Sequence, residues 1–273
     1  MANNPPQIKI PDLILLLGDS ITQQGYDQYS PSLRNYAWVS ALSAAYQRRL
    51  TIINAGLSGY NTLQILHTLP HLIPSAPKIR LITIFLGAND ARLPDTEPKN
   101  APQHIPLGDY KRNLKTIVQH PLIRTHVGGG GGTRILIITP PPIDEGMCEA
   151  DDASKGIHQV RRLASTTLNY AQAAREASQE LNVECLDLWT VFMKEAGWRE
   201  GESLIGQKGV EKKGLERLLR DGLHFTADGE KVLFEALMEK IQEKWPEMAP
   251  LALPFVLPGW NEVEAWKDLK QDA

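Results

Sequence analysis

Three short segments of this chain carry side chains suited to serine acyl-transfer chemistry: Gly18-Asp19-Ser20-Ile21-Thr22, Gly87-Ala88-Asn89-Asp90 and Asp221-Gly222-Leu223-His224. A serine hydroxyl is a weak nucleophile until a neighbouring base takes its proton. His224 can be that base, and Asp221, three residues earlier, can hold the imidazole ring so that its other nitrogen faces Ser20. The residue types therefore predict Ser20 as nucleophile, His224 as general base and Asp221 as the acid that orients the base.

Two further residues can stabilise the negative charge that builds up on a carbonyl oxygen when a serine attacks an ester. Gly56 offers a backbone N–H at a point where a side chain would block close approach. Asn89 carries an amide at the end of an apolar run, where it can donate to an oxyanion or cap the following turn. One oxyanion donor stabilises a transition state by about 3 kcal/mol. We therefore expect Gly56 and Asn89 to act as oxyanion donors.

Ordinary structural roles compete with these interpretations. Ser20 alone could be the N-cap of a helix, since serine is a preferred residue at that position. Asp187 ends a later apolar run and is the main rival for the acid of the triad. Short polar side chains organise tight turns, and that is the role we expect for Asp19, Asn54 and Asp90.

Signatures of other catalytic scaffolds are missing from the sequence. The G-x-S-x-G elbow is absent because Thr22 occupies the position of its second glycine. The chain has no H-E-x-x-H motif, no P-loop and no G-x-G-x-x-G fingerprint. No convergent cluster of histidines and carboxylates is evident, so we predict no metal. The glycine run Gly128–Gly132 precedes an apolar run, whereas a phosphate-binding loop follows a strand, so a flexible loop is expected there.

The elements that must position these residues alternate between apolar runs and helical patterns. Apolar runs without polar alternation are typical of strands buried on both faces, as in a parallel sheet covered by helices. We expect strands at Leu13–Leu17, Leu50–Asn54, Ile79–Leu86, Arg134–Thr139 and Asn182–Leu188, and helices at 34–49, 60–72, 107–121 and 157–181. This alternation predicts a doubly wound α/β domain, in which active residues follow the carboxyl ends of strands.

Two expected helices have specific signals. In 157–181 a set of apolar and small residues recurs at helical spacing: Val160, Leu163, Thr167, Leu168, Ala171 and Ala174. A final helix starts at Thr226, which is a good N-cap, with Asp228 in the first turn. Its inward stripe is expected to consist of Leu233, Leu237 and Ile241.

Three segments fall outside this alternation. Residues 140–156 begin with three prolines and contain an acidic cluster, which is typical of a surface loop. Residues 199–219 are rich in glycine and charge, and we expect a mobile excursion with a short helix. A Pro-rich tail from Pro246 carries apolar side chains that need a surface to pack on, either this domain or a second subunit of a homodimer: Leu251, Phe255, Leu257 and Trp260. No linker divides residues 1–273, so a single domain is expected.

Composition and charge exclude several classes of protein. The 273 residues carry a net charge of −3 with 42% hydrophobic residues, which leaves no basic footprint for nucleic acid. No run approaches the roughly 20 apolar residues that span a bilayer, and the N-terminus lacks the features of a secretory signal. Cys148 and Cys185 match no redox or metal motif. We expect a cytoplasmic protein with two reduced thiols and no stable membrane insertion.

The motifs, taken in order, resemble those of the GDSL, or SGNH, hydrolase superfamily. Gly18–Thr22 is similar to its nucleophile block, Asn54-Ala55-Gly56-Leu57-Ser58-Gly59 to its glycine block, Gly87–Asp90 to its asparagine block and Asp221–His224 to its acid-and-base block. The longer matches Gly18-Asp19-Ser20-Ile21-Thr22-Gln23 and Asp187-Leu188-Trp189 resemble the isoamyl acetate-hydrolysing esterase subgroup in particular. The resemblance covers residues 12 to about 243.

The resemblance implies a three-layer flavodoxin-like fold with a central five-stranded parallel sheet. It also implies a serine esterase that hydrolyses small acetate-type esters without a metal or an organic cofactor. The triad would be Ser20, Asp221 and His224, and the backbone N–H of Ser20 would join Gly56 and Asn89 in the oxyanion hole. An acyltransferase or a carbohydrate deacetylase can use the same parts. A non-catalytic ligand-binding domain is the alternative of another class, but a phosphate site has no need of Asp221 and His224 together.

Overall fold

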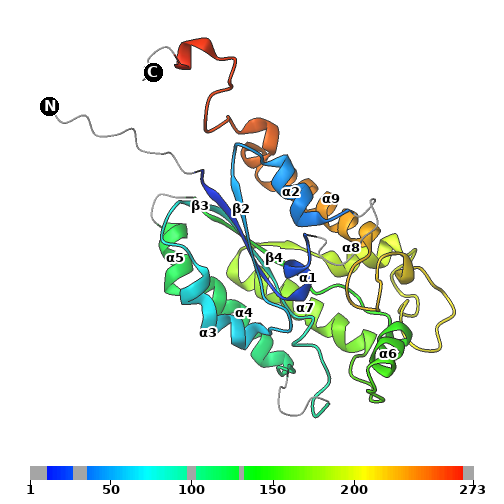
Figure 1. Ribbon diagram of the computed structural model, residues 1–273. Helices are drawn as coiled ribbons and strands as arrows, with labels where there is room; N and C mark the ends of the chain where they lie inside the picture. Colours follow the sequence, from blue (N-terminus) through cyan, green and yellow to red (C-terminus); the bar gives the residue numbers. More distant parts are fainter. Residues whose placement is uncertain (1–10, 27–35, 97–102, 129–131, 267–273) are drawn as a thin grey trace.

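The computed structural model describes residues 11–26, 36–96, 103–128 and 132–266, and in this part of the chain five strands form a parallel sheet (Figure 1). The strands are β1 (Leu13–Gly18), β2 (Thr51–Gly56), β3 (Ile79–Phe85), β4 (Arg134–Ile138) and β5 (Glu184–Leu186). Their order across the sheet is β2-β1-β3-β4-β5, which is the flavodoxin-like order. The order reverses between β1 and β3, so ligands are expected at the carboxyl ends of these strands.

Strand β1 explains why the apolar runs lack polar alternation. Successive side chains of a strand point to opposite faces of the sheet. Ile14 and Leu16 pack into the core on one face, whereas Leu13, Leu15 and Leu17 pack into the core on the other. All five side chains are buried, so helices must cover both faces of the sheet.

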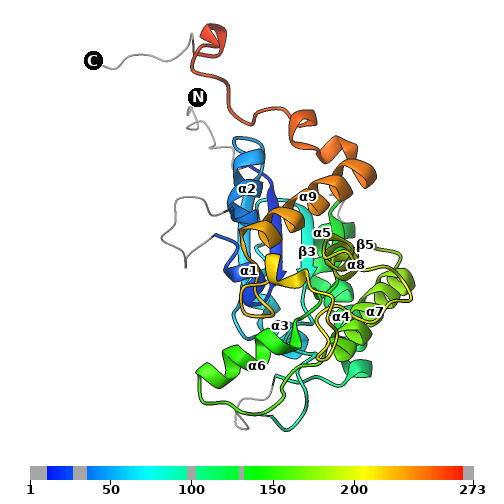
Figure 2. The same ribbon diagram turned by 90° about the vertical axis from the view of Figure 1, so that its right-hand side faces the viewer.

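The helices form two layers, one on each face of the sheet (Figures 1 and 2). The layer beside Ile14 and Leu16 contains α2 (Trp38–Ala45), α8 (Leu188–Glu195) and α9 (Ala227–Lys244). The opposite layer contains α3 (Thr62–Leu72), α4 (Leu107–Gln119), α5 (Pro121–Gly128) and α7 (Ala164–Leu181). The prediction of a three-layer α/β fold with a five-stranded parallel sheet is confirmed.

Helix α9 begins as the sequence predicts. The Thr226 side chain accepts a hydrogen bond from the backbone N–H of Gly229, as an N-cap residue does. Its apolar stripe, Leu233, Leu237 and Ile241, is buried against the sheet.

Two other expected helices differ from the prediction, because one is shorter and the other is divided. The described part of 34–49 contains α2, and the region 107–121 holds α4 and the start of α5, which runs on to Gly128. Residues 129–131 of the glycine run lie outside the described residues.

Helix α7 begins at Ala164 and not at residue 157, so the first seven residues of the predicted helix 157–181 are not helical. Val160, which fitted the helical spacing, is 45% exposed. The segment that precedes α7 is held instead by its side chains. Arg161 forms an ion pair with Asp152, and Arg162 donates to the carbonyl oxygen of Ala88. These tertiary contacts outweigh the local helical pattern.

Residues 140–156 are not the surface loop that we expected, because they contain helix α6 (Glu145–Ser154). The Asp144 side chain caps this helix by accepting the N–H of Met147 at 2.9 Å. Glu145 is buried and accepts the N–H groups of Ala164 and Lys208, both at 2.8 Å. Asp144 thus serves as an N-cap and Glu145 as a buried hydrogen-bond acceptor. The number of acidic residues in the sequence does not show whether they take such roles or are exposed to solvent.

The segment 199–219 is attached to the core and is not a loose excursion. Ile205 and Leu215 are buried in the same core as α8 and α9. A short 3-10 helix, η1 (Leu215–Arg217), supplies the short helix that we expected. The carbonyl oxygen of Gly206 accepts the N–H of Glu145 at 2.8 Å, which fastens this segment to the start of α6.

The C-terminal tail packs on the domain only in part (Figure 2). In η2 (Pro246–Met248) the Met248 side chain is buried, and its carbonyl oxygen accepts the Tyr46 hydroxyl. Further on, the Phe255 ring lies 4.3 Å from the guanidinium groups of Arg48 and Arg49. The short helices η3 (Pro250–Ala252) and η4 (Val263–Trp266) follow η2. Leu251 and Trp260 are 92% and 90% exposed, so packing on a second subunit stays a prediction.

Candidate active site

Ser20 lies at the turn between β1 and helix α1 (Ser20–Gln23). Asp19 is the N-cap residue of α1, because its carboxylate accepts the N–H of Ile21 at 2.9 Å. Ser20 is therefore not the N-cap of this helix, which was the alternative role considered for it. The turn is tight, since a Cβ added to Gly18 would lie 2.0 Å from Oγ1 of Thr22. The strand and the capped helix fix the position of the Ser20 hydroxyl.

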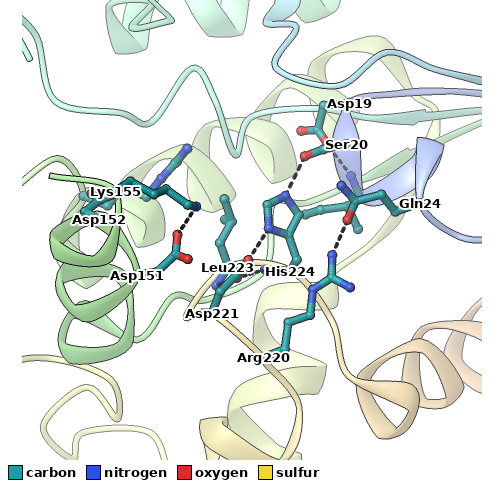
Figure 3. Close-up of polar contacts among 12 residues, drawn as sticks. Asp19, Ser20, Gln24, Asp151, Asp152, Lys155, Arg220, Asp221, Leu223 and His224 are labelled. Atoms are coloured by element: carbon teal, nitrogen blue, oxygen red, sulfur yellow. Dashed lines mark hydrogen bonds and ion pairs between the residues drawn. The ribbon is translucent and has the colours of Figure 1, made fainter. Parts of the chain in front are cut away.

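The structure brings Ser20, His224 and Asp221 into one chain of hydrogen bonds (Figure 3). Ser20 Oγ lies 2.9 Å from His224 Nε2, and His224 Nδ1 lies 2.6 Å from Asp221 Oδ2. Asp221 Oδ1 also accepts the N–H groups of Leu223 at 3.0 Å and His224 at 2.7 Å. Since an ionised carboxylate only accepts hydrogen bonds, the proton of a neutral His224 lies on Nδ1. Nε2 is then an acceptor that faces the Ser20 hydroxyl.

Asp187, the rival acid, lies elsewhere in the fold. It is the N-cap residue of α8 and accepts the N–H of Thr190 at 3.2 Å. It also forms an ion pair with Arg175, at 2.7 Å. The His224 nitrogen that could bind a carboxylate is already bonded to Asp221. The geometry therefore favours Asp221 over Asp187 as the partner of the histidine.

The turn that carries the acid and the base packs on the start of α6. Gly222 has a φ of +84°, a conformation that glycine adopts without strain. Its carbonyl oxygen accepts the N–H of Asp144 at 3.0 Å. An added Cβ would lie 2.5 Å from the Asp144 carbonyl oxygen and 2.8 Å from the Cys148 sulfur. Only glycine lets this turn approach α6 closely enough to point His224 at Ser20.

Three carboxylates at the site have shifted pKa values for different reasons. Burial by itself would raise the pKa of Asp221, but the hydrogen bonds and charge of His224 and two backbone N–H groups outweigh it and hold this pKa well below its ordinary value. Burial raises the pKa of Asp19 to about 6. Burial raises the pKa of Asp90 to about 7, although Thr62 donates two hydrogen bonds to it. Asp221 thus stays ionised at neutral pH.

Asp19, Asn54 and Asp90 organise loops, as predicted. The Asn54 amide donates to the Thr22 carbonyl oxygen at 2.7 Å. Asp90 Oδ1 accepts the hydroxyl of Thr62 at 2.5 Å and its backbone N–H at 3.0 Å. These bonds join β2 to α1 and the loop after β3 to the start of α3.

Gly56 does not fit the oxyanion role that we predicted for it. Its N–H already donates to Asn54 Oδ1 at 2.9 Å, and an added Cβ would lie 2.2 Å from the backbone nitrogen of Gln23. Gly56 therefore packs β2 against α1. Gly59, three residues later, lines the cavity in front of Ser20 and has a φ of +83°. Both glycines belong to the motif Asn54–Gly59, and the sequence alone does not show which of them lines the cavity.

Asn89 lines the same cavity as Ser20 and Gly59. One of its two amide N–H donors binds the carbonyl oxygen of Tyr60 at 2.9 Å, which leaves a second donor for a ligand. Ser20 is the first residue of α1, where a backbone N–H has no partner within the helix. Ser20, Gly59 and Asn89 thus line one cavity, and each of them carries an N–H group.

The cavity has a volume of about 180 Å³ and is mostly polar. It is lined by Ser20, Ser58, Gly59, Asn89, Gln103, Cys148, Asp151, Asp152, Lys155, Arg161, Arg162, Asp221, Leu223 and His224. Much of one wall comes from α6 and from the residues before α7. This wall was not predicted from the sequence, because residues 140–156 were expected to form a surface loop and residues 157–163 to be helical.

Within the described residues no group of three His, Cys, Asp or Glu side chains is arranged to hold a metal ion. Cys148 and Cys185 are not joined in a disulfide. In the same part of the chain, none of the helices has the length and apolar character needed to cross a bilayer.

A flavodoxin-like sheet that presents a Ser–His–Asp chain at its carboxyl edge is the architecture of a hydrolase, and comparison with known proteins identifies the family. The sequence profile of the GDSL-like Lipase/Acylhydrolase family matches residues 16–232. The chain belongs to this family and is a carboxylic ester hydrolase. The resemblance inferred from the four motifs is confirmed.

Named relatives extend this result. The isoamyl acetate-hydrolyzing esterase 1 homolog of Mus musculus is 34% identical over 257 residues, which cover 93% of this chain and 89% of that protein. A GDSL esterase/lipase of Arabidopsis thaliana is 33% identical over 258 residues, which cover 92% of this chain and 93% of that protein. A solved structure of an acetylxylan esterase mutant from Geobacillus stearothermophilus superposes with a TM-score of 0.58 at 21% identity, over 86% of this chain and 95% of that one. This last likeness shows a shared fold.

Proposed function

We propose that this esterase hydrolyses small acetate-type esters through an acyl-enzyme formed on Ser20. One observation carries the proposal: the hydrogen-bond chain from Ser20 Oγ through both ring nitrogens of His224 to Asp221, with distances of 2.9 and 2.6 Å. Such a chain allows a base to take the hydroxyl proton as the oxygen attacks.

The first half of the reaction acylates Ser20. Ser20 Oγ attacks the carbonyl carbon of the ester, and His224 Nε2 accepts the hydroxyl proton. Asp221 stays ionised and stabilises the imidazolium that forms, while its backbone hydrogen bonds keep the ring in place. The tetrahedral intermediate then expels the alcohol, which takes the proton from Nε2.

The second half returns the enzyme to its starting state. His224 takes a proton from a water molecule that attacks the acyl carbon, and the acid leaves as Ser20 regains its proton. In both halves negative charge develops on the former carbonyl oxygen. We assign its stabilisation to the N–H groups of Ser20 and Gly59 and to the Asn89 amide, in place of the Gly56 donor expected from the sequence. Each such donor contributes about 3 kcal/mol to transition-state stabilisation.

Two observations support a small acyl group. The cavity of about 180 Å³ is smaller than the roughly 300–1,000 Å³ typical of sites for drug-sized ligands. The mouse relative is named for the hydrolysis of isoamyl acetate, an ester with a two-carbon acid. We expect kcat/KM to fall as the acyl chain of a p-nitrophenyl ester lengthens from acetate to decanoate.

Two alanine variants and a control test the proposal. Ser20→Ala and His224→Ala should lose almost all hydrolysis of p-nitrophenyl acetate, because removal of a triad nucleophile or base costs up to about 10⁶ in turnover. Ser58→Ala is the matched control, since Ser58 also lines the cavity but has no base beside it in the proposal. Retention of more than a few per cent of activity by Ser20→Ala, with a folded protein, would contradict the proposal.

A polar alcohol is a second possibility for the leaving group, as in a carbohydrate deacetylase. Asp151 and Lys155 line the cavity and pair with each other at 2.5 Å, so the cavity offers charged groups to a hydroxyl-rich alcohol. Isoamyl acetate and glyceryl monoacetate share an acyl group and differ in the polarity of the alcohol. A higher kcat/KM for the glyceryl ester would favour the deacetylase.

A further inference from the structure

Arg162 lines the cavity but belongs to no motif of the sequence. It precedes α7 and reaches across to the loop that follows β3. There its guanidinium donates one hydrogen bond to the carbonyl oxygen of Ala88 and a second, at 3.4 Å, to Asn89 Oδ1. The backbone supports the same approach, because the N–H of Leu93 donates to the carbonyl oxygen of Arg161 at 2.9 Å. The two loops are thus joined on both sides of Asn89.

Arg162 has no direct ion pair, although the charges of Asp19 and Asp152 act on it from a greater distance. Two other cationic side chains at the cavity have a direct ion-pair partner: Arg161 pairs with Asp152 and Lys155 pairs with Asp151. Among the described residues, no carboxylate lies within ion-pair distance of Arg162. Burial lowers the pKa of Arg162, but an arginine side chain does not lose its proton in proteins. A cation therefore lies beside the atoms that would stabilise an oxyanion.

The contacts of the Asn89 amide define its orientation. An amide group can be turned by 180° with little change in shape, and its hydrogen bonds decide between the two orientations. The Tyr60 carbonyl oxygen requires a donor from Asn89, and the Arg162 guanidinium requires an acceptor. Both are satisfied only when Nδ2 lies toward Tyr60 and Oδ1 toward Arg162. In this orientation Nδ2 has a second N–H that does not bind Tyr60, and an oxyanion can accept a hydrogen bond from it.

We propose that Arg162 is a positioning residue of the oxyanion hole: it binds Asn89 Oδ1 and the Ala88 carbonyl oxygen, and so fixes and polarises the amide that donates to the reacting carbonyl oxygen. This inference rests on the proposed function. Arg162 acts through Asn89 and touches no reacting atom. Because the developing charge exists mainly in the transition state, loss of Arg162 should lower kcat and leave KM nearly unchanged.

A double-mutant cycle on the full chain tests this coupling, with p-nitrophenyl acetate as substrate. Asn89→Ala should lower kcat by about 10²–10³. Arg162→Met should lower kcat by at least about tenfold, and Arg162→Lys by less, because lysine keeps a charged donor. In the Asn89→Ala background Arg162→Met should have almost no further effect, since the group that it positions is gone. Added guanidinium ion should restore part of the activity of Arg162→Met.

Arg175→Met is the matched control. Arg175 also hydrogen-bonds near the sheet, to Asp187, but it does not line the cavity, so kcat should stay unchanged. Equal losses from Arg162→Met in the wild-type and Asn89→Ala backgrounds would overturn the inference, as would a rise in KM with constant kcat. If Asn89→Ala lowers kcat and Arg162→Met does not, only the inference fails. If Asn89→Ala is fully active, the proposed oxyanion hole fails as well.

Discussion

Replacement of Asp221 by asparagine separates the two tasks of this carboxylate. Oδ1 accepts two backbone N–H groups, at 3.0 and 2.7 Å, and Oδ2 accepts His224 Nδ1 at 2.6 Å. In Asp221→Asn the oxygen can keep the backbone contacts, which places the amide nitrogen opposite Nδ1. Two donors cannot share one hydrogen bond, so the ring proton moves to Nε2. A protonated Nε2 cannot accept the Ser20 proton.

The expected loss of kcat is large, because in the wrong tautomer the His224 ring is still in place but cannot act as a base. The matched substitution in a serine protease lowers kcat by about 10⁴, which corresponds to about 5 kcal/mol in the activation barrier. Initial rates of p-nitrophenyl acetate hydrolysis measure kcat, and far-UV circular dichroism checks that the variant is folded. The free energy of unfolding should fall as well, because the backbone hydrogen bonds of the turn survive but the ionised carboxylate whose pKa the fold holds low is lost.

Asp187→Asn is the control, because Asp187 was the rival acid. It loses the ion pair with Arg175 and keeps an N-cap side chain, so its stability should fall by no more than about 1 kcal/mol and its kcat should be unchanged. An Asp221→Asn enzyme that retains a tenth or more of wild-type kcat would contradict the role assigned to Asp221. So would an Asp187→Asn enzyme that loses as much activity as the Asp221 variant.

Three further predictions follow from the packing and the buried charges. Gly59→Ala should lower kcat at least tenfold with a folded protein, whereas Gly56→Ala should lower the melting temperature, because its Cβ would overlap the backbone of α1; the reverse pattern would restore Gly56 to the oxyanion hole. Burial raises the pKa of Asp90 to about 7, so the folded state holds this proton more tightly than the unfolded state. The free energy of unfolding should therefore fall as the pH rises from about 4 to 7, by up to about 1.4 kcal/mol per pH unit from this group; urea unfolding should show a smaller slope for Asp90→Asn, and an equal slope would contradict the assignment. Truncation after Trp245 removes the buried Met248 and should lower the melting temperature, whereas truncation after Gly259 should leave it unchanged.

Much of the fold could be predicted from the sequence, because its signals are local. Leu13–Leu17 is a continuous apolar run, and burial of alternate residues in two different cores explains it. Thr226 and the stripe of α9 are likewise set by capping and helical spacing. The contact between Asp221 and His224 could be predicted because the two residues are three positions apart, so one turn suffices to bring them together.

The remaining site residues could not be predicted, because tertiary contacts place them. Arg162 reaches the site only because α7 starts at Ala164 and not at residue 157. Helix α6 was missed because its N-cap, Asp144, follows three prolines and lies next to an acidic cluster that also fits a solvent-exposed loop. Whether Gly56 or Gly59 lines the cavity depends on where β2 ends relative to α1. The spacing of residues in the sequence does not show this.

Labelling with a fluorophosphonate probe shows whether Ser20 is the nucleophile, because this reagent reacts with an activated serine hydroxyl. The wild-type enzyme should gain one phosphonyl group per chain, lose its esterase activity in proportion, and carry the label on the peptide that contains Ser20. Ser20→Ala should gain no label. Hydrolysis by an enzyme that resists the probe, or a label that persists in Ser20→Ala, would contradict the assignment of Ser20 as the nucleophile.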